Sequence, residues 1–257
     1  MRLPKIDRIA IRGFMTESPP VFDKQTLLDQ AQRFREKGER AIRTAGIEVD
    51  EILAKEIISP NSDTRNGVSI IARPLPEVAE EIRRIQRHLF ALEPQQYYYP
   101  PQDLHTTIVE VAFGKTPAEV SSIVEQLHQA LPAIMRDLPE PILEIVGMGF
   151  DPKGCAINFV PRNEQLQILR AQIQERLEGI GIPLKSRYLT TAAHVSFFRY
   201  IQPLQTEKNQ WADYLIHTPI DMRITWKISS LCITWGPNWY GNWSRIHTTG
   251  PFPLEPG

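Results

Sequence analysis

The sequence predicts an α+β protein whose helices and strands fall into two similar halves. From Gly67 onward, short runs rich in β-branched and apolar residues alternate with longer amphipathic segments that carry helix-capping residues. Each half contains a helix, a strand with a histidine, a second helix and a pair of strands, in that order. With 257 residues, 42% of them apolar, the chain can bury a core as one large domain or as two lobes.

In the first half, each predicted helix begins at a residue with a known preference for helix starts. Pro76 suits the first turn of a helix, and Glu77 lies near the positive end of the helix dipole. Thr116 and Glu119 have the spacing of a capping box. Together with the apolar periodicity, these signals predict a strand at 68–72, a helix at 76–92, a strand at 104–112, a helix at 116–131 and a hairpin of 143–150 with 155–160.

The second half has the same order of elements, although no sequence repeat is readable between the halves. Asn163 is a suitable N-cap, and Gly181 follows the last apolar position of the helix that Asn163 begins. The predicted elements are a helix at 163–180, a strand at 189–200, a helix at 206–217 and strands near 222–227, 229–235 and 244–248.

The first 60 residues differ in composition from the rest of the chain. Residues 23–45 are dense in Gln, Arg, Lys and Glu, with apolar residues at helical spacing, and Gly46 follows as a stop. We interpret this segment as an amphipathic helix packed on the main domain; a partner-binding arm is the alternative. The predicted organisation is an N-terminal helical extension at 1–60, a main domain at 61–250 and a tail at 251–257.

Composition excludes several classes of function. A net charge of −1 provides no basic field for long duplex DNA. The two cysteines, Cys155 and Cys232, form neither a disulfide framework nor a metal-ligand cluster, so we expect no metal and no cofactor. Without an 18-residue apolar run or an apolar stretch near the N-terminus, we expect no membrane span and a cytoplasmic location. The oligomeric state stays open.

Two predicted strands place a histidine two residues before a hydroxyl residue. These are His105 with Thr107 and, 89 residues later, His194 with Ser196. Because residues i and i+2 of a strand point to the same face, each segment presents an imidazole and a hydroxyl to the same space. His247 with Thr249 fits the same spacing, but Gly250-Pro251 follows at once and no helix precedes it. We therefore expect His247 to lie outside the site.

Two such pairs suit in-line attack on a phosphodiester. A neutral imidazole can take a proton from the attacking water or hydroxyl, while a protonated one gives a proton to the leaving oxygen. The hydroxyls can donate to the non-bridging oxygens, where negative charge grows in the transition state. This chemistry needs no metal ion.

The two segments resemble the paired motifs of the two-histidine phosphoesterases, also called the LigT-like or 2′-5′ RNA ligase-like superfamily. Residues 99–108, Tyr-Pro-Pro-Gln-Asp-Leu-His-Thr-Thr-Ile, are similar to its first motif with the lead-in. His194-Val195-Ser196-Phe197-Phe198-Arg199 is similar to its second motif, with Ser196 in place of the commoner Thr. Glu110 stands in motif one where motif two has Arg199. The resemblance covers Gly67 to Thr248.

The resemblance implies a bilobal LigT-like fold: two pseudo-symmetric lobes of antiparallel sheet with helices outside and a central cleft. It implies His105 and His194 as the acid–base pair, and Thr107, Ser196 and Arg199 as phosphate ligands. The implied activity is metal-independent hydrolysis of a 2′,3′-cyclic phosphate of RNA or of a nucleotide. RNA ligation, which is the reverse reaction, and a non-catalytic module that binds nucleotides or RNA ends are the alternatives.

Aromatic residues near the motifs could stack a nucleobase. Tyr99 directly precedes motif one, and Trp239 and Tyr240 belong to an aromatic cluster near the C-terminus. Aromatic faces beside a phosphate site can contribute about 1–3 kcal/mol per stacked base. Hydrophobic packing is the alternative role for each of these rings.

Overall fold

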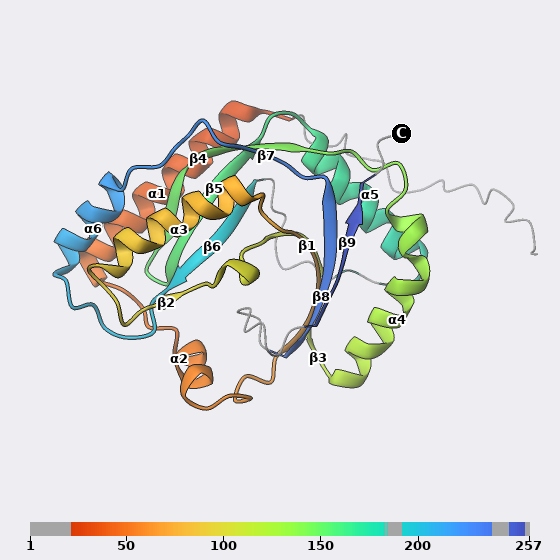
Figure 1. Ribbon diagram of the computed structural model, residues 1–257, viewed down its shortest axis with the longest axis horizontal. Coiled ribbons are helices and arrows are strands. Elements are labelled where there is room, and N and C mark those ends of the chain that lie inside the picture. The colour runs from red at the N-terminus through yellow and green to blue at the C-terminus, as the bar shows by residue number, and fades with distance from the viewer. Residues whose placement is uncertain (1–21, 183, 185–191, 238–246, 255–257) are drawn as a thin grey trace, which may run out of the picture.

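The computed structural model describes residues 22–182, 184, 192–237 and 247–254, which form helices and two antiparallel sheets (Figure 1). The helices are α1 (Lys24–Ala45), α2 (Glu51–Ile58), α3 (Pro76–Phe90), α4 (Pro117–Ile134), α5 (Gln165–Gly179) and α6 (Lys208–His217). The strands are β1 (Asn66–Ala72), β2 (Tyr97–Tyr98), β3 (Thr106–Lys115), β4 (Ile142–Asp151), β5 (Gly154–Pro161), β6 (Ala193–Arg199), β7 (Thr225–Lys227), β8 (Ser230–Pro237) and β9 (His247–Pro253). The predicted α+β class is confirmed.

Each sheet contains one of the two histidine motifs. The first sheet has the strand order β3-β1-β8-β9, and the second has the order β2-β6-β5-β4-β7. Every described strand pair is antiparallel. The two-lobed arrangement is therefore confirmed, with motif one at the start of β3 and motif two on β6.

Two features of the sheets differ from the sequence analysis. The short strand β2 was not foreseen; it pairs with β6, with Tyr97 opposite Arg199. At the other end of the chain, β9 continues to Pro253, and the Leu254 amide donates to the Ser229 carbonyl over 2.9 Å. Residues 251–253, which were predicted to belong to a tail, therefore complete the first sheet.

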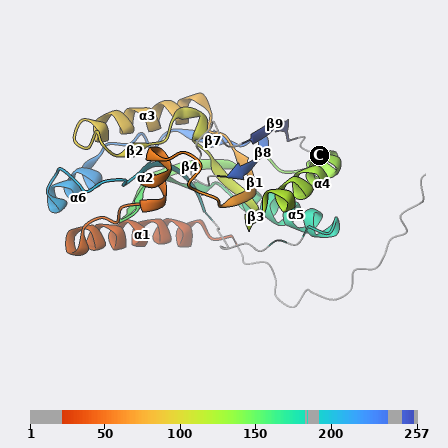
Figure 2. The same cartoon turned by 90° about the horizontal axis from the view of Figure 1, so that it is seen from below.

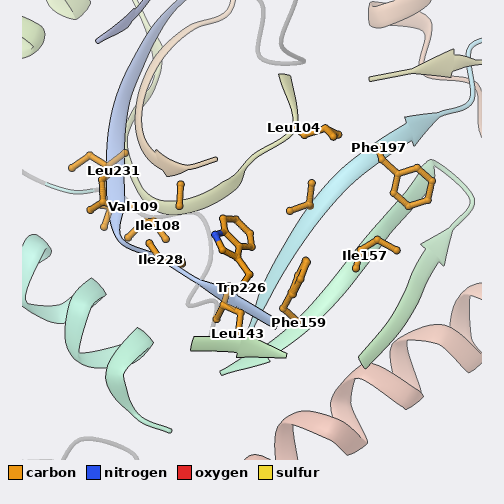
Figure 3. Close-up of a cluster of buried hydrophobic side chains, with 14 of the residues drawn as sticks. Leu104, Ile108, Val109, Leu143, Ile157, Phe159, Phe197, Trp226, Ile228 and Leu231 are labelled. Carbon is orange, nitrogen blue, oxygen red and sulfur yellow. The ribbon is translucent and has the colours of Figure 1, made fainter. Parts of the chain in front are cut away.

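One hydrophobic core extends through both sheets. Trp226, which is 1% exposed, lies between Ile108 on the side of the first sheet and Phe159 on the side of the second (Figure 3). Burying each large apolar side chain contributes about 1.5–3 kcal/mol. Because the same side chains pack against both sheets, the two lobes share this stabilisation.

The helices cover both sheets, and the second sheet is covered on both faces. Helices α4 and α5 contact the first sheet. Helices α3 and α1 lie on opposite sides of the second sheet (Figure 2). The helix predicted at 23–45 is confirmed, and it is an integral layer of the second lobe. Its packing on the main domain, as expected from the sequence, is through β4 and β5 of the second sheet.

Helix α1 docks on β4 through a close backbone approach. Gly38 faces the Phe150 carbonyl so closely that a Cβ atom on Gly38 would lie 1.8 Å from that oxygen. Ile42 of the same helix is fully buried, and Arg35 donates to the Ile216 carbonyl over 2.5 Å. The missing side chain at residue 38 therefore sets how near α1 lies to the second sheet.

We expect Gly38→Ala to destabilise the protein, because the added methyl group must push α1 away from β4. In an exposed helix the same change would stabilise by about 1 kcal/mol, whereas overpacking a tight interface costs about 1–3 kcal/mol. Urea denaturation measures the net effect, and Lys37→Ala, an exposed neighbour on α1, is the control. A Gly38→Ala protein as stable as the wild type would contradict the close approach.

Candidate active site

A β-bulge in β6 places three polar side chains of motif two on one face. The register with β5 shifts by one residue between Ser196 and Phe198, so Phe197 is an extra residue in the strand. Phe197 and Phe198 are both fully buried, whereas His194, Ser196 and Arg199 are exposed or half-buried. The bulge reverses the alternation once, so Arg199 shares the open face with His194 and Ser196 although it lies three residues after Ser196.

Motif one has the same geometry on β3. The register with β1 shifts between Thr107 and Val109, which makes Ile108 the extra residue. Ile108 and Val109 are buried, whereas His105, Thr107 and Glu110 are half-buried. Both motifs therefore present an imidazole, a hydroxyl and a charged side chain from one face of a bulged strand. The charged residue is Glu110 in motif one and Arg199 in motif two.

The backbone before β3 fixes the tautomer of His105. Its Nδ1 lies 2.7 Å from the Asp103 carbonyl, which can only accept, so Nδ1 carries the proton. In the neutral ring Nε2 then has the free lone pair. Arg73, at the end of β1, donates to the carbonyls of Gln102 and Leu104 and so holds this turn in place.

The protein environment keeps both imidazoles neutral in the absence of a ligand. Burial lowers the pKa of His105 to about 4, and the charges of Arg73 and His194 act in the same direction. Strands β3 and β6 contact each other although they belong to different sheets, so the two motifs lie near each other.

The pKa of His194 is also lowered. Its side chain is open to solvent on one side, but desolvation by the surrounding protein is the largest cause, followed by the charges of Arg170 and Arg199. Asp151 opposes these effects and raises this pKa. A phosphate bound beside the two imidazoles would favour their protonated forms, because opposite charges stabilise each other.

Arg170 of α5 forms hydrogen bonds to the backbone of both motif segments. This role was not predicted from the sequence. Its Nη2 and Nε donate to the carbonyls of Thr107 and Ile108, each over 3.2 Å, and its Nη1 donates to the Ala192 carbonyl over 3.1 Å. The side chain is 8% exposed, and burial lowers its pKa to about 10, so it is charged at neutral pH. The signal in the sequence was an arginine beside Leu169 on the apolar stripe of the predicted helix.

A pocket of about 400 Å³ opens beside motif two. His194, Ser196 and Arg199 lie along one side of it. His105 and Thr107 are not among the described residues that line this pocket. The structure thus gathers three of the predicted site residues in one cavity, whereas His105 lies directly before β3 of the first sheet.

The aromatic residues predicted to stack a base have different outcomes. Tyr99 is 4% exposed, and its ring lies edge-on to Tyr97 at a centroid distance of 5.1 Å, as the packing alternative expects. Trp239 and Tyr240 lie outside the described residues. The ring of His247 stacks on Trp235 at 5.5 Å.

Within the described part of the chain, no group of three or more His, Cys, Asp or Glu side chains is placed to hold a metal ion. None of the described helices has both the length and the apolar character needed to cross a membrane.

Comparisons with known proteins identify the fold. No family model and no curated protein matches the sequence. Among solved structures, the chain is similar to a conserved protein of unknown function, ATU0111, from Agrobacterium tumefaciens, with a TM-score of 0.58 and 13% identity over 85% of this chain and 99% of that one. It is also similar to TT0787 of Thermus thermophilus, with a TM-score of 0.51 and 13% identity over 73% and 97% of the two chains. E. coli LigT matches with a TM-score of 0.45 and 15% identity over 76% and 96%.

We expect Arg170 to position both histidines. Arg170→Lys keeps the charge but loses donors to the three carbonyls, which should cost about 1–3 kcal/mol of stability, and Arg170→Met should cost more. Urea denaturation measures this cost, and the NMR signals of the His105 and His194 rings report their geometry.

The matched control is Arg176→Lys. Arg176 lies on the same helix and also donates to backbone carbonyls, those of Ile134 over 2.7 Å and Arg136 over 2.5 Å. It should lose stability without moving either histidine signal. Equal effects of the two substitutions on the histidine signals would contradict a positioning role for Arg170.

Proposed function

We propose that this chain, which has the bilobal LigT-like fold of the two-histidine phosphoesterases, is a metal-independent phosphodiesterase that hydrolyses a 2′,3′-cyclic phosphate of RNA or of a nucleotide. The observation that carries the proposal is the matched geometry of the two motifs: each presents an imidazole and a hydroxyl from the open face of a bulged strand. Binding alone does not require two protonatable groups within reach of each other.

In the proposed reaction, His105 is the general base. The Asp103 carbonyl holds its Nδ1 proton, so Nε2 is free to accept a proton from the attacking water. Its lowered pKa keeps the ring neutral at the pH of the reaction. Water then forms a bond to phosphorus as the bond to one ribose oxygen breaks, which leaves a 2′-phosphate and a 3′-hydroxyl.

His194 is the general acid in this proposal, because it shares its face with the groups suited to hold the phosphate. The Ser196 hydroxyl and the Arg199 guanidinium can donate to the non-bridging oxygens. The negative charge of the bound substrate favours the protonated form of His194, which then gives its proton to the leaving oxygen. From the side of His105, the Thr107 hydroxyl can donate to the same phosphate, and Glu110 adds a negative charge to that side.

The first test is hydrolysis of a 2′,3′-cyclic nucleotide in the presence of EDTA. We expect the wild type to turn over, and we expect His105→Ala and His194→Ala each to lose about 10²- to 10⁴-fold in kcat, the usual contribution of a general acid or base. The double variant should lose little more than either single variant, because the two residues act as a unit.

His247→Ala is the matched control, because it removes the third histidine that has the same sequence spacing. It should retain wild-type kcat. A wild type that binds nucleotide without turnover would favour the binding module of the same fold, and rescue of activity only by added metal would contradict the proposed mechanism.

The pKa shifts predict an acidic optimum for kcat/KM. The rate should rise through pH 4 as His105 becomes neutral and fall above the lowered pKa of His194 as the acid loses its proton, so the maximum lies below pH 6.5. Arg199→Met should move the alkaline limb to higher pH, because the Arg199 charge lowers the pKa of His194. A kcat/KM that rises between pH 7 and pH 8 would contradict this assignment of roles.

A further inference from the structure

The pocket beside motif two has two chemically different sides. His194, Ser196 and Arg199 of β6 form the polar side. Leu27, Ala31 and Phe34 of α1 form an apolar side. The three α1 residues are spaced by four and three positions, so they lie on one face of the helix.

Phe34 is the distinctive residue of the apolar side. Its side chain is 45% exposed, although the residue belongs to a helix that is docked on the second sheet. Leu27, two turns earlier on the same face, is only 5% exposed. The ring of Phe34 is therefore left accessible within the pocket.

An amide side chain also lines the pocket. Asn158 of β5 is the direct cross-strand neighbour of His194, and both residues line the pocket. A Cβ atom at Gly149 would lie 2.4 Å from the Asn158 amide nitrogen, so the glycine leaves room for this side chain. The Asn158 amide offers both donors and an acceptor, which suits the edge of a nucleobase.

We propose that this pocket is a nucleoside site: the base stacks on Phe34 of α1, the Asn158 amide meets its edge, and the phosphate lies at His194, Ser196 and Arg199. The inference rests on the proposed function and assigns the residues that would select a substrate with a nucleobase, Phe34 and Asn158. A cavity of about 400 Å³ is within the range of small-ligand sites. Helix α1 thereby contributes to specificity rather than to chemistry.

The test compares a ligand that has a base with one that has none. Isothermal titration calorimetry measures binding of adenosine 2′-monophosphate and of inorganic phosphate to the wild type, Phe34→Ala, Phe34→Tyr and Phe90→Ala. We expect Phe34→Ala to weaken nucleotide binding about tenfold or more, because it removes a stacking surface. Phosphate binding should not change, Phe34→Tyr should bind as the wild type, and Phe90→Ala, an exposed phenylalanine on α3, should change neither.

A second variant tests the pocket by filling it. Ala31→Trp adds a bulky ring one helical turn from Phe34, so it should weaken nucleotide binding and leave phosphate binding intact. If Phe34→Ala and Ala31→Trp both leave nucleotide binding unchanged, or weaken phosphate binding equally, the inference is overturned.

The two proposals can fail separately. The wild type could bind the nucleotide more tightly than phosphate, in a way that depends on Phe34, and still not hydrolyse the cyclic nucleotide. That result would support the nucleoside site and contradict the proposed hydrolase. If the wild type and Phe34→Ala hydrolyse the cyclic nucleotide with the same kcat/KM, the proposed hydrolase is supported and the nucleoside site is contradicted. A wild type that binds neither ligand overturns both.

Discussion

The buried guanidinium of Arg170 connects two strands that no common sheet holds together. Strand β3 belongs to the first sheet and β6 to the second, and Arg170 donates to the carbonyls of Thr107, Ile108 and Ala192. Burying a charged group costs several kcal/mol, which charge-assisted hydrogen bonds to these carbonyls offset. Helix α5 thereby sets the separation of the two motifs, and the shared core around Trp226 keeps the sheets from moving apart.

On these two strands, the β-bulges determine which side chains reach the site. A regular strand would send a residue three positions after Ser196 to the opposite face. The extra residue, Phe197 in β6 and Ile108 in β3, reverses the alternation and brings Arg199 and Glu110 to the open face. The motifs are thus equivalent in backbone geometry and differ in the charged residue that each presents.

The two lobes also differ in the helices that cover their sheets. The close approach of Gly38 to the Phe150 carbonyl keeps the helix near the sheet, and its apolar face then lines the pocket beside His194. The first lobe has α4 and α5 on its sheet, whereas the second lobe is covered on both faces by α3 and α1. The segment that composition separated from the main domain is therefore part of the candidate site.

The sequence by itself determined most of the helices and strands and the pairing of each histidine with a hydroxyl, because capping residues, apolar periodicity and the two-residue repeat of a strand are local properties. Helix α2 was not predicted. Only the tertiary structure decided the rest. The short strand β2, the position of α1 over the pocket and the burial of Tyr99 follow from contacts between distant segments. Arg170 is the clearest case. Beside Leu169 it is one polar residue on an apolar stripe, and its role emerges only when two carbonyls of β3 and the carbonyl just before β6 converge on it.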